Sequence, residues 1–126
     1  MTAPIKIIVF ILGGVFTLIG IVGLFAPAVL AGELGLTLTG GEGAGSVRAM
    51  IGAHYLAMGG VCLYAAARDR TVLLLPVGAI EAMMVVARAL SILSGEFVTT
   101  AVLPTIVELA AAGVLLSTSL KALRSQ

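Results

Sequence analysis

Four long apolar stretches alternate with short polar segments along the chain. They run from about residues 5–25, 47–67, 71–93 and 101–120. Each holds the roughly 20 consecutive, mostly apolar residues that a helix needs to cross the hydrocarbon core of a bilayer. The pattern therefore predicts an all-α fold, an integral membrane four-helix bundle that occupies residues 1–126 as a single transmembrane domain.

Turn-forming residues separate the predicted spans. Residues 31–46, AGELGLTLTGGEGAGS, make the longest connection, and its GGEGAGS end is predicted to be a flexible loop because clustered glycines mark loops. RDR at 68–70 forms a tight turn, and SGEFVTT at 94–100 joins the third span to the fourth. Pro104 falls in the first turn of the fourth span, where a missing N–H is tolerated. Pro76 lies inside the third span and is predicted to kink it.

Composition agrees with this pattern. Of the 126 residues, 60% are hydrophobic and 10% are charged, whereas average globular domains are about 25% charged. A soluble chain of this length could not bury so much apolar surface. The net charge of +1 leaves no basic face for nucleic acid, and the single cysteine, Cys62, excludes an intramolecular disulfide.

The charged residues between the spans predict an orientation. Five basic side chains lie in or beside the connections on one side: Lys6, Arg68, Arg70, Lys121 and Arg124. The connections on the other side carry Glu33, Glu42 and Glu96. Because short cytoplasmic connections are rich in Lys and Arg, both termini are predicted to be cytoplasmic. A secretory signal cleaved after Ala31 is the alternative for the first span, but its apolar run exceeds the usual 7–15 residues or so.

Polar residues inside the spans are predicted to meet at one depth. At about 1.5 Å per helical residue, His54 and Glu108 lie roughly 10 Å, and Arg88 roughly 8 Å, below the outer boundary. Arg48 lies at that boundary, and Glu81 lies near mid-bilayer. Because a charge near the bilayer centre costs about 2.5–3.5 kcal/mol on insertion scales, these groups should neutralise one another in the outer half of the bundle.

Helical spacing indicates which of these residues share a face. Glu81 and Arg88 are two turns apart and therefore face the same way. A second stripe combines Arg48 and Tyr55 with Gly52 and Gly59, whose lack of a side chain permits close helix approach. Spacing alone leaves open whether His54 or Tyr55 faces the bundle, since they lie roughly 100° apart. Close packing is also expected for glycines of the first span (Gly13, Gly14, Gly20 and Gly23), with homo-oligomerisation as the alternative.

These polar residues have two interpretations. They are either a structural ion-pair network or a binding site, whose candidate residues are Arg48, His54, Tyr55, Glu81, Arg88 and Glu108. His54 is more often a hydrogen-bonded interior histidine than a ligand or catalyst. No metal site is expected, because there is no HExxH or paired ExxH spacing and the nearby arginines oppose a cation.

Two segments carry a family resemblance. RAMIGAHYLAMGG (48–60) and ARALSILSGE (87–96) resemble an uncharacterised family, a domain of unknown function, of small four-helix bacterial membrane proteins that is distantly DoxX-like. The shared positions are Arg48, Ala49, Gly52, Arg88, Leu90, Ser91, Gly95 and Glu108. Ser46 stands where members of the family often carry an acid. The resemblance implies a four-helix bundle in the bacterial cytoplasmic (inner) membrane and offers no established activity.

Three functions follow as hypotheses. The favoured one is a small ligand-binding or accessory subunit of a membrane complex, with an amphiphilic ligand or a larger complex as its partner. The second is a membrane-embedded isomerase or hydrolase acting on a lipid-like substrate, with His54, Glu81 and Glu108 as acid and base. A proton-coupled transporter is the third, although no inverted repeat is visible. No cofactor and no nucleic-acid partner is expected.

Overall fold

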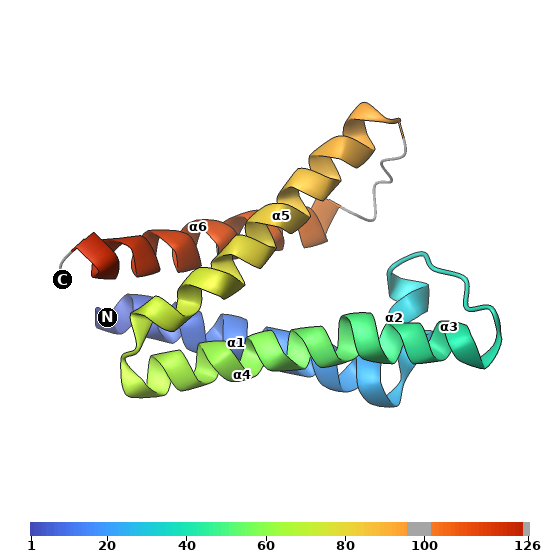
Figure 1. Cartoon of the computed structure of the whole chain (residues 1–126), viewed down its shortest axis with the longest axis horizontal. Coiled ribbons are helices and arrows are strands. Elements are labelled where there is room, and N and C mark those ends of the chain that lie inside the picture. The colour runs from blue at the N-terminus through green and yellow to red at the C-terminus, as the bar shows by residue number, and fades with distance from the viewer. Residues whose placement is uncertain (96–101, 125–126) are drawn as a thin grey trace. The chain divides into compact units, whose positions relative to one another are not determined.

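Helices form all the regular structure of residues 1–95 and 102–124, the part of the chain that the computed structural model describes (Figure 1). In chain order they are α1 (Ala3–Phe25), α2 (Pro27–Glu33), α3 (Gly40–Ser46), the π-helix η1 (Val47–Gly52), α4 (Ala53–Arg68), the 3₁₀-helix η2 (Thr71–Leu73), α5 (Leu74–Leu93) and α6 (Val102–Arg124). The predicted all-α fold is confirmed.

Four helices are long and apolar enough to cross a membrane, as predicted. They are Ala3–Phe25, the uninterrupted helix Gly40–Arg68, Thr71–Leu93 and Val102–Arg124. Their length and composition are those of a multi-pass membrane protein. The second begins at Gly40 rather than near residue 47, and the fourth ends at Arg124 rather than near residue 120.

The chain divides into two compact units. The α1–α4 unit is Ile7–Tyr64, and the α5–α6 unit is Met1–Lys6 together with Ala65–Gln126. The start of α1 and the last turn of α4 therefore belong to the α5–α6 unit.

Glycines bring α1 and the helix Gly40–Arg68 into backbone contact within the α1–α4 unit. A Cβ added to Gly20 would lie 2.7 Å from the Cα of Leu56, and one on Gly59 would lie 2.8 Å from the carbonyl oxygen of Gly13. A Cβ on Gly52 would lie 2.8 Å from the carbonyl carbon of Gly23. Small residues let helices approach this closely in lipid, where packing rather than the hydrophobic effect drives association. The predicted close packing is confirmed for Gly13, Gly20 and Gly23 and is wrong for Gly14, where an added Cβ would have nothing within 4 Å among the described residues.

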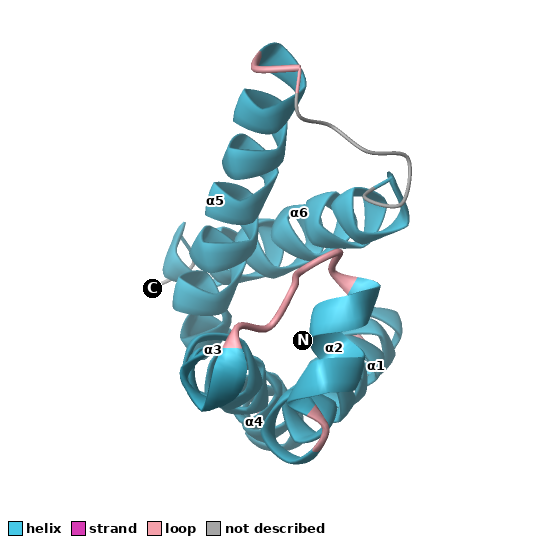
Figure 2. Cartoon of the chain, turned by 90° about the vertical axis from the view of Figure 1, so that its right-hand side faces the viewer, coloured by secondary structure: helices cyan, strands magenta, loops and turns pink. Residues whose placement is uncertain are grey.

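The segment 40–46 is helical, so the prediction of a flexible loop there is wrong. α3 covers GGEGAGS and runs directly into η1, although glycine is a poor helix former. This segment is continuous with the candidate spanning helix Gly40–Arg68, in which backbone N–H and C=O groups bond internally. The true loop is shorter and spans residues 34–39, drawn between α2 and α3 in Figure 2.

The short helix α2 packs against the π-helix η1 of the second span. Leu30 and Ala31 of α2 form a buried cluster with Val47 of η1. α2 ends in a Schellman motif, in which the Leu36 N–H donates to the Ala31 carbonyl at 2.8 Å and Gly35 has a φ of +69°. Glycine adopts this left-handed conformation at little cost, so Gly35 sets where the helix stops.

The α5–α6 unit is built on an antiparallel helix pair. A Cβ on Gly78 of α5 would lie 2.9 Å from the backbone nitrogen of Leu116 of α6, so the two backbones nearly touch there. α6 also packs on η2, which precedes α5. The end of α6 therefore lies beside the start of α5.

Asp69 organises the turn that ends α4. Its φ of +53° is left-handed, and the Arg70 N–H donates to the Ala65 carbonyl at 2.9 Å, which again makes a Schellman motif. The Lys6 ammonium donates to the Asp69 carboxylate at 3.2 Å, so the start of α1 is held to this turn. That hydrogen bond and the charge of Lys6 lower the pKa of Asp69 below its ordinary value of 3.8.

All four prolines of the chain lie in the first turn of a helix. Pro4, Pro27 and Pro104 occupy the second, first and third positions of α1, α2 and α6. Pro76 lies inside the span Thr71–Leu93, at the third position of α5, which begins at Leu74 after the 3₁₀ turn η2. The kink expected there stays a prediction. The first N–H groups of a helix have no intrahelical acceptor, so a missing one costs nothing there.

Gly59→Ala should destabilise the protein, and Gly60→Ala should not. A methyl group on Gly59 meets the backbone of α1, whereas nothing lies within 4 Å of one on Gly60. We expect the first change to lower the free energy of unfolding by about 1–3 kcal/mol. The second should leave it unchanged or raise it by up to about 1 kcal/mol. Heating in detergent with a thiol-reactive dye measures this, since Cys62, the sole cysteine, is buried. Equal midpoints for both variants would contradict the packing.

Asp69→Asn should destabilise the protein only where the carboxyl is ionised. Because the folded-state pKa of Asp69 is lowered, the contribution of its ion pair is present above about pH 3.8 and is lost as the pH falls through the lowered value. Thermal melts followed by circular dichroism should therefore separate the two proteins at neutral pH and coincide at strongly acidic pH. Asp69→Ala should melt lower at every pH, since alanine tolerates a positive φ poorly. A gap between the unchanged protein and the Asp69→Asn variant that does not depend on pH would exclude the ion pair as its cause.

Candidate functional site

Arg88 of α5 and Glu108 of α6 form a two-point ion pair. The Arg88 Nε donates to Glu108 Oε2 at 3.3 Å, and its Nη2 donates to Oε1 at 3.2 Å. The Glu108 side chain is 6% exposed and that of Arg88 is 30% exposed. Paired N–H donors fix the orientation of both groups, which a single contact would not. Of the predicted cluster, these two residues are brought together.

The antiparallel pairing of α5 and α6 explains why they meet. Arg88 lies five residues before the end of α5, and Glu108 lies six residues after the start of α6. At about 1.5 Å per residue, both are roughly 8–9 Å from the same end of the helix pair. Packing of the two helices at Gly78 then sets which faces meet.

Glu81 is the most deeply buried charged residue that the structure describes. It is 1% exposed, and neither carboxylate oxygen has a hydrogen-bond partner among residues 1–95 and 102–124. Glu108 is close enough to act on it electrostatically. A buried polar group without a partner costs free energy, and a buried carboxylate costs more. The expectation that Glu81 shares in a neutralising network is thus not met by any hydrogen bond among the described residues.

Arg48 makes a hydrogen bond that the sequence did not predict. Its Nε donates to the backbone carbonyl of Leu24 at 3.0 Å, and its side chain is exposed. Leu24 belongs to the last turn of α1, whose carbonyls lack helical partners because α1 ends at Phe25. Arg48 therefore caps α1, as basic side chains near helix C-termini commonly do. The sequence contained a signal for this in Pro27, which has no N–H to offer these carbonyls.

Tyr55 and His54 lie on different sides of α4. Tyr55 is half-buried, and its ring lies 5.8 Å from that of Phe16 of α1. His54 is exposed, with its ring edge-on to that of Tyr55 at 6.2 Å. Tyr55 is thus the residue that faces α1, which spacing alone left open. The acid–base role of His54 with Glu81 and Glu108 stays a prediction.

Three buried polar groups were not predicted from the sequence: the hydroxyl of Thr17, and the side chains of Thr118 and Ser119 in α6. Thr17 of α1 contacts Gly59, and its hydroxyl has no hydrogen-bond partner among the described residues. Its position one turn from Gly13 on the packed face of α1 was the available signal. Residues 1–95 and 102–124 contain no group of three or more His, Cys, Asp or Glu side chains that could hold a metal ion.

Comparison with known proteins finds no match, so the functional proposal for this chain rests on its geometry. No protein-family model matches the chain, and neither the curated proteins nor the solved structures contain a match. The DoxX-like resemblance therefore stays a prediction.

Arg88→Leu should be more destabilising than the double change Arg88→Leu with Glu108→Leu. The single change leaves the carboxylate of Glu108 buried without its partner, which typically costs about 3–5 kcal/mol. Since Arg88 is 30% exposed, we expect the lower part of that range. Replacing both residues removes the stranded charge and should restore most of the stability. Thermal melts followed by circular dichroism provide the measurement, and additive effects of the two changes would contradict a direct pair.

Proposed function

We propose that this chain is a small multi-pass protein of the bacterial cytoplasmic membrane that binds an amphiphilic molecule beside Glu81. It would serve as a ligand-binding or accessory subunit of a membrane complex. The observation that carries the proposal is the burial of the Glu81 carboxylate, at 1% exposure, with no hydrogen-bond donor among the described residues. Ionisable groups inside spanning helices are rare and mark sites by default.

The chemistry of the bound group follows from the side chains around it. A carboxylate accepts hydrogen bonds, so the ligand must supply a donor such as a hydroxyl or an amine. Arg88 uses two of the five N–H donors of its guanidinium on Glu108, so up to three remain for an acceptor on the ligand. A polar group carrying both a donor and an acceptor, on an apolar body, matches this arrangement.

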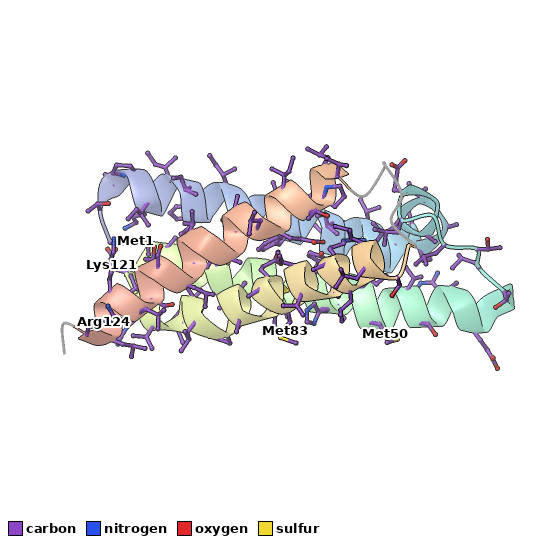
Figure 3. The ribbon with its side chains drawn as sticks, turned by 90° about the horizontal axis from the view of Figure 1, so that it is seen from above. Met1, Met50, Met83, Lys121 and Arg124 are labelled. Atoms are coloured by element: carbon purple, nitrogen blue, oxygen red, sulfur yellow. The ribbon has the colours of Figure 1, made fainter. Side chains whose placement is uncertain are left out.

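The depth of the site favours a ligand from the bilayer. Arg88 and Glu108 lie roughly 8–9 Å from the ends of α5 and α6, and Glu81 lies roughly 18 Å from the end of α5. Met83 (Figure 3) and Val86, which follow Glu81 along α5, are exposed apolar side chains. A molecule that reaches this depth must itself be largely apolar.

The proposal also includes the orientation of the chain and the membrane in which it lies. The five basic flanking residues support cytoplasmic termini, since short cytoplasmic connections carry the excess of Lys and Arg. In that orientation the ion pair of Arg88 and Glu108 lies within the outer half of the bilayer. The resemblance of residues 48–60 and 87–96 to small DoxX-like proteins supports a bacterial cytoplasmic membrane.

Glu81→Leu should remove a bound molecule and also stabilise the empty protein. Native mass spectrometry of the protein, extracted gently from its own membrane, should show an added mass that tandem fragmentation identifies. Glu81→Leu should abolish this mass and raise the free energy of unfolding by about 1–3 kcal/mol, because a buried polar group without a partner is replaced by an apolar one. Loss of the added mass together with a gain in stability would identify Glu81 as part of a binding site, because replacing a purely structural residue would lower the stability instead.

Met83→Leu provides the matched control. Met83 lies on the same helix two residues away, is 66% exposed and should tolerate leucine without losing the added mass. A protein that carries no added mass, or an added mass that survives Glu81→Leu, would overturn the proposal.

A further inference from the structure

Four basic side chains gather at one end of the α5–α6 unit, and we call them the basic end. They are Arg68 in the last turn of α4, Arg70 in the turn that follows, and Lys121 and Arg124 in the last turn of α6. The packing of α6 on η2 brings the end of α6 to the turn that contains Arg68 and Arg70. Figure 3 shows Lys121 and Arg124 at the end of α6 where Met1 also lies.

Lys6, the fifth basic residue that flanks the spanning helices, has a different environment from these four residues. Lys6 is half-buried and is paired with Asp69 at 3.2 Å. Arg68, Arg70, Lys121 and Arg124 are all exposed, and none forms an ion pair with a described residue. The N-terminal ammonium of Met1 also pairs with Asp69, at 3.4 Å, so this carboxylate is occupied by Lys6 and Met1 and the basic end has no ion-pair partner among residues 1–95 and 102–124.

Apolar side chains lie directly beside these charges. Leu120 and Leu123, on the same turns of α6 as Lys121 and Arg124, are 44% and 40% exposed. Val72 and Leu73, which follow Arg70 in η2, are 37% and 41% exposed. A soluble anion would use only the cations, whereas a molecule with an anionic head and apolar tails uses both kinds of side chain.

We propose that the basic end binds the phosphodiester headgroup of anionic phospholipids. Two pairs of cations at the boundary of the spanning helices supply the charge, and the leucines and valine beside them pack on the first carbons of the acyl chains. Each Lys or Arg near an anionic surface contributes roughly a fivefold gain in affinity. This inference rests on the spanning helices and does not depend on the site at Glu81.

Native mass spectrometry of the full chain in detergent tests the proposal directly. The protein is titrated with phosphatidylglycerol and with phosphatidylcholine of the same acyl chains, and separately with glycerol phosphate. Phosphatidylglycerol should bind more tightly than phosphatidylcholine. The double change Arg68→Gln with Arg70→Gln should weaken its binding roughly thirtyfold, and so should Lys121→Gln with Arg124→Gln. A cooperative thermal melt followed by circular dichroism shows that each variant is folded.

Two single variants provide a control in which every basic residue is kept. Asp69→Asn frees Lys6 and should tighten phosphatidylglycerol binding roughly fivefold. Glu42→Gln changes the net charge by the same amount, but Glu42 lies on α3, roughly 40 Å along the helix from Arg68, and should have no effect.

Three outcomes would overturn the proposal. One is equal binding of the two phospholipids by the unchanged protein. Another is equal tightening by Asp69→Asn and Glu42→Gln, which would mean that only net charge matters. The third is binding of glycerol phosphate as tightly as the lipid, which would make the basic end a phosphate site rather than a lipid site.

Discussion

The absence of water from the interior of a bilayer is the constraint on which this structure depends. A polar group there must be paired within the protein or with a bound molecule, because no solvent can pair it. Of three charged side chains of the spanning helices, two meet this requirement within the described residues and the third does not. Arg48 bonds a backbone carbonyl at the end of α1, Arg88 bonds Glu108 across two helices, and Glu81 has no donor among the described residues. The last of these is why Glu81, rather than the ion pair, carries the functional proposal.

The same environment explains how the helices pack. Apolar side chains gain little by leaving lipid for protein, so association relies on close contact between backbones. Gly20, Gly23 and Gly59 supply that contact in the α1–α4 unit, and Gly78 supplies it between α5 and α6. Gly52 belongs to the π-helix η1 and lies against Gly23, while Arg48 of the same π-helix reaches the end of α1. Close packing and the capping of α1 therefore occur at the same point of the second span.

Prediction from sequence succeeded where the signal is local and strong. The four spans follow from runs of apolar residues, and the meeting of Arg88 with Glu108 follows from their similar distance from one end of two consecutive antiparallel helices. It failed at GGEGAGS, where glycine propensity predicted a loop but backbone bonding continued the helix. For Arg48 the depth was estimated from sequence, but the partner was not, because a carbonyl at a helix end carries no side-chain signature.

By itself, the sequence determined that the chain is helical, that four helices can cross a membrane, and which ionisable residues those helices carry. These properties depend on hydrophobicity and on distance along the chain, which any reader of the sequence can measure. Only the tertiary structure decided which of those residues are paired, that Tyr55 rather than His54 faces α1, and that Lys6 is neutralised while the basic end is not. Pairing depends on the rotation of each helix about its axis, and that rotation is set by backbone contacts between glycines far apart in the sequence.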